Sequence, residues 1–239
     1  MNNRQITGIA SGFEDLDRIT GGFQKGELIV IGARPSLGKT TLALSMVSHI
    51  SFLEKIPTAF FSLEMENTTL KSRIMNINGN ISASLFVIAT PNMSLTDLCN
   101  RAHELHSNKQ VEIIFIDYLG LIIHEDKSLQ RNEQVSHILK SLKRIAVELQ
   151  IPLVLLCQLP REPKQEAPSL ANLGDMGSIG DEADLVLFLH RNENESLTDL
   201  IVAKQKNGYT GVVKLDMDTE VRKYIPVARE NSIDDDLCF

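Results

Sequence analysis

Short apolar runs alternate with stretches of helical periodicity along most of this chain. Runs so uniformly apolar are typical of strands that are buried on both faces, as in a parallel sheet covered by helices. They predict strands at residues 28–31, 58–61, 86–89, 112–116, 153–157, 185–189, 200–203 and 212–215.

Helices are predicted between several of these runs. The clearest covers residues 132–149, where the apolar side chains form one stripe along the helix and basic residues occupy the opposite face. Another begins at Ser94, because Ser94 and Asp97 are spaced as a capping box in which Asp replaces the usual Glu. A third covers residues 42–50. The pattern as a whole predicts an α/β fold, a mostly parallel sheet flanked by helices on both faces.

Three segments stand outside this pattern. Residues 160–183 are rich in Pro and Gly and are expected to be long loops, which inside a compact domain are usually functional or disordered. Residues 76–85 run from a helical pattern straight towards a strand, and residues 228–239 form an acidic tail. We expect residues 1–239 to form a single domain.

Composition and charge narrow the class of protein. The 239 residues are 43% hydrophobic and 23% charged, which is ordinary for a globular chain. No apolar stretch is long enough to cross a bilayer and the start lacks a signal peptide, so we expect a cytoplasmic protein without membrane contact. The net charge of −7 argues against broad, non-specific coating of nucleic acid, so any DNA contact is expected to be local.

Cysteine and histidine spacing gives no support for a disulfide framework or a metal centre. Cys99, Cys157 and Cys238 are far apart and odd in number, so reduced thiols are expected. His103 and His106 would share a helical face, but no third ligand stands at a recognisable spacing. An ordinary polar helix face is the favoured interpretation of this pair.

The segment "GARPSLGKT" fits the phosphate-binding pattern G-x-x-x-x-G-K-[ST]. Its glycines allow backbone N–H groups to point at phosphate oxygens, Lys39 can reach the β- and γ-phosphates, and the Thr40 hydroxyl can ligate Mg²⁺. The alternative is a turn that merely happens to carry Lys-Thr, but the predicted order of strand, loop and helix favours a P-loop. The predicted nucleotide-binding residues are Gly32, Ala33, Arg34, Pro35, Ser36, Leu37, Gly38, Lys39, Thr40 and Thr41.

Three polar residues follow other predicted strands. Asp117 ends one buried strand and is expected to hold Mg²⁺ together with Thr40; the alternative is an N-cap or a turn residue. Glu64, just past the next strand after the P-loop helix, is a candidate to activate water, or else the first-turn Glu of a helix. Gln158 is a candidate γ-phosphate sensor, or a residue that caps its strand.

Six segments then occur in a fixed order: "GARPSLGKTTLAL", "FSLEM", "IIFIDYL", "LVLLCQL", "GSIGDEADLVLFLHR" and "IVAKQKNG". In the order and nearly the sequence of these segments, the chain resembles the RecA-like motor domain of replicative hexameric DNA helicases, the DnaB family. The resemblance covers nearly the whole chain. It implies a RecA-like P-loop NTPase fold that uses ATP and Mg²⁺ to move along single-stranded DNA and unwind duplex.

The resemblance also implies roles for particular residues. Residues 32–40 would be the Walker A loop, Asp117 the Walker B acid, Glu64 the catalytic carboxylate and Gln158 the γ-phosphate sensor. Lys204 and Lys206 would act on the nucleotide of the adjacent subunit of a homo-hexamer. The loop from residue 173 to 179, with Gly174, Asp175 and Gly177, would touch the DNA backbone in the central channel.

Several departures from the family pattern bear on these roles. Lys206 stands where the family usually has an arginine finger, and lysine lacks the planar fork that grips phosphate at two points. Gly174 stands where a basic residue is typical; Arg161 and Lys164 either compensate or are merely solvated. We expect no amino-terminal collar domain of the family before Met1, and residues 76–85 form a shorter segment than usual, either a genuine shortening or a place where residues are missing. Either change would weaken ring assembly.

These features predict the ATP-hydrolysing motor domain of a replicative helicase, with primase and a helicase loader as further partners. Two alternatives remain open at this point. One is another RecA-type ATPase without unwinding activity, which a forked DNA substrate would distinguish. The other is a nucleotide-responsive scaffold that does not hydrolyse ATP.

Overall fold

A computed structural model describes residues 5–160, 166–171, 173, 178–192, 195–206 and 208–227. In this part of the chain, nine strands form one sheet in the order β3-β2-β4-β5-β1-β6-β7-β8-β9. The strands are β1 (Leu28–Ala33), β2 (Thr58–Ser62), β3 (Leu85–Ala89), β4 (Ile113–Asp117), β5 (Leu153–Gln158), β6 (Leu185–His190), β7 (Thr198–Gln205), β8 (Gly211–Asp218) and β9 (Lys223–Pro226).

The sheet has a parallel part and an antiparallel part. Strands β3, β2, β4, β5, β1 and β6 pair in parallel, with Leu28 opposite Leu153 and Ser62 opposite Asp117. Strands β7, β8 and β9 continue the sheet in antiparallel pairing from β6. All eight predicted strands are present, whereas β9 was not predicted. The mostly parallel sheet that the apolar runs predict is therefore confirmed.

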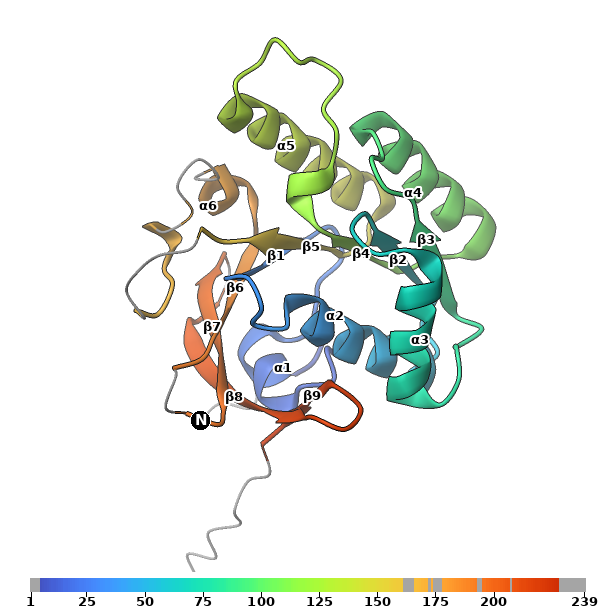
Figure 1. Ribbon diagram of the computed structural model, residues 1–239. Helices are drawn as coiled ribbons and strands as arrows, with labels where there is room; N and C mark the ends of the chain where they lie inside the picture. The colour runs from blue at the N-terminus through green and yellow to red at the C-terminus, as the bar shows by residue number, and fades with distance from the viewer. Residues whose placement is uncertain are drawn as a thin grey trace, which may run out of the picture.

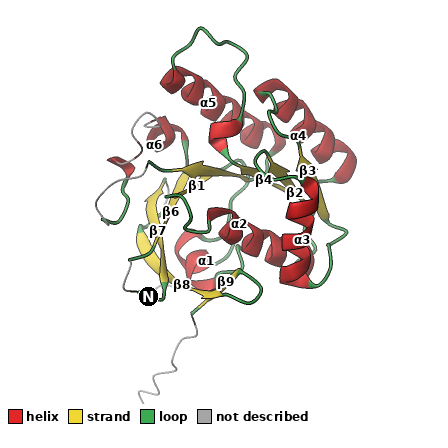
Figure 2. Ribbon diagram, in the orientation of Figure 1, coloured by secondary structure: helices red, strands yellow, loops and turns green. Residues whose placement is uncertain are grey.

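Helices cover both faces of this sheet (Figures 1 and 2). Helices α4 and α5 pack on one face, and α1, α2 and α3 pack on the other, each against its own cluster of buried apolar side chains. The helices are α1 (Glu14–Thr20), α2 (Lys39–Ser48), α3 (Asn67–Asn78), α4 (Leu95–Lys109), α5 (Arg131–Leu149) and α6 (Ser178–Glu182), with a π-helical turn at His49–Leu53 and a 3₁₀ turn at Leu119–Leu121.

Local sequence explains where the two long helices start. The Ser94 hydroxyl accepts the N–H of Asp97 at 3.0 Å, so α4 begins where the predicted capping residue stands. The Asp97 side chain, which is shorter than the Glu usual in a capping box, accepts a hydrogen bond from that hydroxyl at 2.8 Å. At α5, the Glu133 carboxylate accepts the backbone N–H of Gln130 at 2.9 Å and completes a capping box that was not predicted.

Two predicted irregular segments differ in outcome. Within residues 160–183, predicted as loops, residues 178–182 form α6, so the prediction is wrong there. Its short length gives too little periodicity to reveal a helix. Between α3 and β3, residues 79–84 are the link, which starts at Gly79 with a positive φ of 70°.

No helix in the described part of the chain is long and apolar enough to span a membrane.

Candidate nucleotide-binding site

Four neighbouring parallel strands end at the same edge of the sheet and bring polar residues together there. Ala33 at the end of β1 lies opposite Gln158 at the end of β5, and Ser62 at the end of β2 lies opposite Asp117 at the end of β4. Glu64 follows two residues after β2. Ligands of open α/β sheets bind at this carboxyl edge, so the arrangement defines a candidate site.

The loop between β1 and α2 needs its two glycines for different reasons. A Cβ on Gly32 would lie 2.8 Å from the ring of Phe188, so the close packing of β1 on β6 excludes a side chain. Gly38 has a φ of +79° and is the N-cap of α2. This left-handed conformation favours glycine and turns the chain so that α2 starts with its N–H groups at the site.

Lys39, Thr40 and Asp117 form a tight polar cluster beneath the loop. The Lys39 ammonium lies 2.6 Å from one carboxylate oxygen of Asp117, and the Thr40 hydroxyl donates to the other at 2.6 Å. The Asp117 side chain is only 1% exposed, and these two donors replace the hydrogen bonds with water that burial removes. The ring of Tyr118 also lies below the ammonium, 4.8 Å from its centroid.

A cavity of about 310 Å³ opens above this cluster. The exposed side chains of Glu64 and Gln158 line it together with Lys39. Burial raises the pKa of the Tyr118 hydroxyl, and the nearby Glu64 and Asp117 carboxylates raise it further. The cavity is lined by Ala33, Arg34, Pro35, Ser36, Gly38, Lys39, Thr40, Thr41, Glu64, Arg73 and Gln158.

Two of the predicted loop residues do not line this cavity. Gly32 packs against Phe188, and the carbonyl of Leu37 accepts a hydrogen bond from the Tyr224 hydroxyl of β9 at 2.8 Å. Both residues shape the loop from behind. For these two residues, direct contact with nucleotide stays a prediction, since Gly32 lies against Phe188 and the Leu37 carbonyl faces Tyr224.

A second cavity, of about 360 Å³, adjoins the first and shares Thr41 and Arg73 with it. Its other lining residues come from α2, from α3 and from the turn between β8 and β9. They are Leu44, Asn76, Ile77, Glu220, Val221 and Arg222. Arg73 and this turn were not predicted, because no recognisable motif marks α3 and β9 itself was not predicted.

The residues present fit a magnesium ion. A hydroxyl and a carboxylate are hard oxygen donors, which Mg²⁺ prefers, and in such sites phosphate and water supply the remaining ligands. Thr40 and Asp117 offer this donor pair side by side. In the described part of the chain, no group of three or more His, Cys, Asp or Glu side chains is arranged to hold a metal. His106, for example, bonds the carbonyl of Val111 at 2.8 Å.

Burial keeps the thiol of Cys157, beside the site, protonated. This residue pairs with Gly32 across β5 and β1 and is fully buried. Burial raises the pKa of the thiol to about 12, despite the opposing charge of Lys39. The thiol therefore stays protonated at neutral pH and serves as a small apolar side chain.

Lys204 and Lys206 lie at the opposite end of the sheet from the P-loop. The backbone N–H of Lys206 donates to the carbonyl of Asp184, and Asp184 in turn bonds the first residue of β1, Leu28. The P-loop lies at the other end of β1, about 16 Å along the strand from Leu28. These two lysines therefore do not join the site formed by their own chain.

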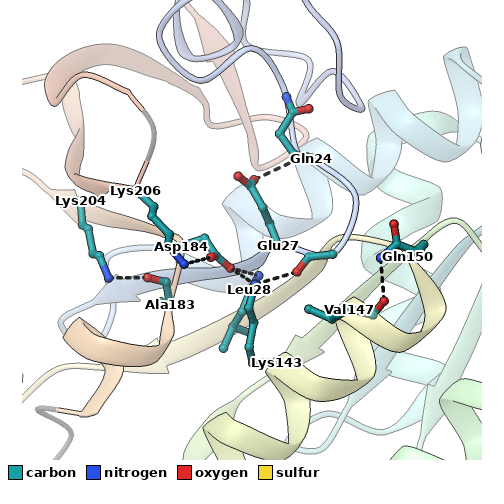
Figure 3. Close-up of polar contacts among 11 residues, drawn as sticks. Gln24, Glu27, Leu28, Lys143, Val147, Gln150, Ala183, Asp184, Lys204 and Lys206 are labelled. Atoms are coloured by element: carbon teal, nitrogen blue, oxygen red, sulfur yellow. Dashed lines mark hydrogen bonds and ion pairs between the residues drawn. The ribbon is translucent and has the colours of Figure 1, made fainter.

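Both lysines have partners within the chain (Figure 3). The Lys204 ammonium donates to the carbonyls of Gly180 and Ala183 at the end of α6, both at 2.7 Å. The Lys206 ammonium is 3.9 Å from Asp184, whose carboxylate also accepts Lys143 at 2.6 Å. Lys206 has a side chain that is 66% exposed, so it remains accessible to a neighbouring molecule.

The predicted DNA contacts at Arg161, Lys164, Gly174, Asp175 and Gly177 lie outside the described residues. The ends of the predicted channel loop are described: Leu173 and Ile179 are buried in the core cluster that α4 and α5 cover.

The family model for the DnaB-like helicase C terminal domain matches residues 8–85 and 81–225. The chain belongs to this family. The resemblance in the six sequence segments is thereby confirmed. The two matched ranges overlap at residues 81–85, at the end of the link between α3 and β3. Nucleotide binding goes with membership of this ATPase family.

Curated relatives of this DnaB-like chain agree with the family match. The replicative DNA helicase DnaB of Treponema pallidum is 42% identical over 250 residues, which cover 94% of this chain and 57% of the relative. The DnaB of Geobacillus stearothermophilus is 34% identical and covers 96% of this chain and 59% of the relative. The chain thus spans somewhat over half the length of these helicases.

Solved structures confirm the fold. One solved ATPase domain superposes with a TM-score of 0.86 at 26% identity, covering 95% of this chain and 93% of that domain. A DnaB-like replicative helicase, described with its interactions with primase, gives a TM-score of 0.84 at 26% identity and covers 94% of this chain and 63% of that one.

Proposed function

We propose that this DnaB-like chain is an ATP-hydrolysing motor domain that drives unwinding of DNA. The observation that carries the proposal is the cluster of Lys39, Thr40 and Asp117 at the start of α2, with Glu64 and Gln158 on the rim of the same cavity. Phosphoryl transfer depends mainly on positioned charges, and this edge of the sheet concentrates them.

Each residue has a chemical task in this proposal. Backbone N–H groups of the loop and the Lys39 ammonium bind the phosphates, while Glu64 accepts a proton from the attacking water as its oxygen bonds to the γ-phosphorus and ADP leaves. Thr40 and Asp117 would hold Mg²⁺, which when bound neutralises charge on the phosphate oxygens. Gln158 is positioned to report on the γ-phosphate.

The second cavity supports nucleotide binding at this edge. It begins at Thr41 and Arg73, where the phosphate cavity ends, and its volume of about 360 Å³ suits a nucleoside. Leu44, Ile77 and Val221 provide apolar surface there. We infer that the phosphates occupy the first cavity and the nucleoside the second.

A ring of subunits would complete the site. The separation of Lys206 from the P-loop of its own chain, together with its exposure, supports a role at the site of an adjacent subunit in a homo-hexamer. Lys204 would need to leave the carbonyls of α6 to act in the same way. Because lysine grips phosphate at one point only, stimulation in trans is expected to be weaker than with arginine.

Contact with single-stranded DNA is proposed for the loop between Leu173 and Ile179, with Gly174, Asp175 and Gly177, helped by Arg161 and Lys164. Both ends of this loop, Leu173 and Ile179, are anchored in the core. A shift of the sheet on nucleotide binding would therefore move the DNA contact, which supports coupling between hydrolysis and movement along DNA. Primase and a helicase loader are further proposed partners; one DnaB-like relative is described with primase.

The test is steady-state ATP hydrolysis by the purified chain, with and without single-stranded DNA, beside Glu64→Ala. We expect hydrolysis to fall about 100-fold or more, because the base for water is lost. Glu66→Ala is the matched control: Glu66 is an exposed carboxylate two residues away that makes no capping hydrogen bond.

The other outcomes decide between the alternatives. Equal rates for Glu64→Ala and the unchanged chain would remove Glu64 from the chemistry. Hydrolysis that ignores DNA and fails to separate a forked duplex would favour another RecA-type ATPase. Nucleotide binding without turnover at any protein concentration would favour a scaffold that responds to nucleotide.

A further inference from the structure

The last strand of the sheet reaches back to the P-loop through one buried side chain. Tyr224 lies in β9, which packs on α2 (Figure 1), and the residue is 2% exposed. Its hydroxyl donates to the carbonyl of Leu37 at 2.8 Å. Burial raises the pKa of this hydroxyl, so it remains a protonated donor at neutral pH.

This hydrogen bond fixes the orientation of one peptide group in the loop. The carbonyl of Leu37 and the N–H of Gly38 belong to the same planar trans peptide, so they point in opposite directions. With the carbonyl turned towards β9, the N–H of Gly38 is turned away from β9. Gly38 lines the phosphate cavity, and its N–H is one of the donors expected to meet phosphate.

The aromatic ring of Tyr224 supports the same peptide by contact. A Cβ on Gly38 would lie 3.2 Å from the Tyr224 ring and hydroxyl, tighter than ordinary packing. The ring therefore lies directly against the Gly38 backbone, which has a φ of +79°. The hydrogen bond and the ring contact thus bear on the same peptide, at a residue whose left-handed φ is open to glycine.

A second connection runs from the same residue into the helix. The backbone N–H of Tyr224 donates to the Ser45 hydroxyl at 2.9 Å, and that hydroxyl donates to the carbonyl of Thr41 at 2.8 Å. Thr41 lines both cavities. One residue of β9 thus connects to the loop before Lys39 and to the first turn of α2 after it.

We propose that Tyr224 is a positioning residue for nucleotide binding, which orients the Leu37–Gly38 peptide so that the Gly38 N–H faces the phosphates. This inference rests on the proposed function of the P-loop. Tyr224 touches no reacting atom and acts through the loop.

The variant that isolates the hydroxyl is Tyr224→Phe, which keeps the ring against Gly38. We expect the Kd for ADP and the KM for ATP to rise about threefold to tenfold, the range for one lost hydrogen bond. The kcat should stay within about twofold, since the N–H binds phosphate equally in the ground and transition states. Titration with a fluorescent ADP and steady-state kinetics on the full chain measure these constants.

Tyr209→Phe is the matched control, because it removes the same hydroxyl from a residue that is 81% exposed. Its Kd for ADP should equal that of the unchanged chain. Thermal unfolding of both variants separates positioning from folding. A merely structural tyrosine would lower the unfolding temperature and the active fraction, and hence kcat, while leaving KM and Kd unchanged.

The outcomes are distinct. A weaker Kd and higher KM in Tyr224→Phe alone support the proposal. A Kd within twofold of the unchanged chain, or a fall in kcat alone, overturns it while the proposed function stands. Failure of the unchanged chain to bind ADP would overturn the proposed function, and this inference with it.

Discussion

Buried carboxylates are stabilised in different ways at different places in this molecule. Asp117 and Asp184 each accept a lysine ammonium at 2.6 Å and a further donor. Asp17, 2% exposed in α1, accepts the backbone N–H of Ser11 at 2.8 Å. Burial raises the pKa of Asp17, and its hydrogen bonds with Ser11 only partly oppose this effect. Ionised Asp17 therefore costs folding free energy, whereas the lysine-paired carboxylates lie beside compensating charge.

A pH dependence of stability follows for Asp17. Its folded pKa lies above the ordinary value of 3.8, so the unfolded chain releases the proton first as pH rises. Stability is thus lost between that value and the folded pKa, and the loss persists above it. Asp17→Asn keeps an acceptor for Ser11 but cannot ionise.

Chemical denaturation of both proteins from pH 4 to pH 8 measures this effect. The free energy of unfolding of Asp17→Asn, relative to the unchanged chain, should increase as pH rises and then level off. A difference that does not change with pH would show that Asp17 titrates alike in the folded and unfolded states.

The β7–β8 hairpin contacts α6 through the side chain of Lys204. Lys204 of β7 binds the carbonyls at the end of α6 and so stabilises the helix that follows the proposed channel loop. Lys206, just beyond β7, has most of its side chain exposed. A change at Lys204 would therefore disturb α6 as well as any contact in trans, whereas a change at Lys206 tests that contact more cleanly.

Mixing of subunits tests whether Lys206 acts in trans. Glu64→Ala subunits keep Lys206, and Lys206→Ala subunits keep Glu64, so some boundaries in mixed rings carry both intact groups. We expect each variant alone to hydrolyse ATP slowly, and their mixture to exceed the mean of the two by about twofold or more.

Lys214→Ala, which removes an exposed lysine from β8, is the control for the loss of positive charge on this hairpin. Its mixture with Glu64→Ala should follow simple averaging of the two rates. Simple averaging for the Lys206→Ala mixture as well would contradict action in trans.

At the scale of the whole molecule, the sheet separates two parts of the proposed machinery. The P-loop, Glu64 and Gln158 lie at the carboxyl ends of the parallel strands, and Lys206 lies near the opposite end of β1. A single chain can therefore bind nucleotide but holds only part of the proposed hydrolytic site. Apposition of two chains would bring the parts together.

Hydrolysis should consequently depend on protein concentration while nucleotide binding does not. We expect the ATPase rate per chain to rise with chain concentration until assembly is complete, because association supplies the missing group. The Kd for fluorescent ADP should stay constant over the same range. A constant rate per chain from dilute to concentrated protein, with a monomer observed by light scattering, would mean that one chain contains the complete site.

Much of the fold and part of the candidate site could be predicted from the sequence. Uniform apolar runs marked the buried strands because a strand covered on both faces admits few polar residues. The spacing of Gly32, Gly38 and Lys39 marked the loop, since its chemistry depends on near neighbours in the chain. Glu64, Asp117 and Gln158 followed from one further rule, that parallel strands deliver their carboxyl ends to the same edge.

The α/β class, the P-loop and the polar residues at the strand ends are encoded locally, in apolar periodicity and turn chemistry. The addition of β9 at the edge of the sheet, the position of Arg73 between two cavities and the contact of Tyr224 with the P-loop arise only from the folded arrangement. The hydrogen bond between Tyr224 and Leu37 spans 187 positions. No local pattern encodes such a contact, because it exists only once the strands between them have formed the sheet.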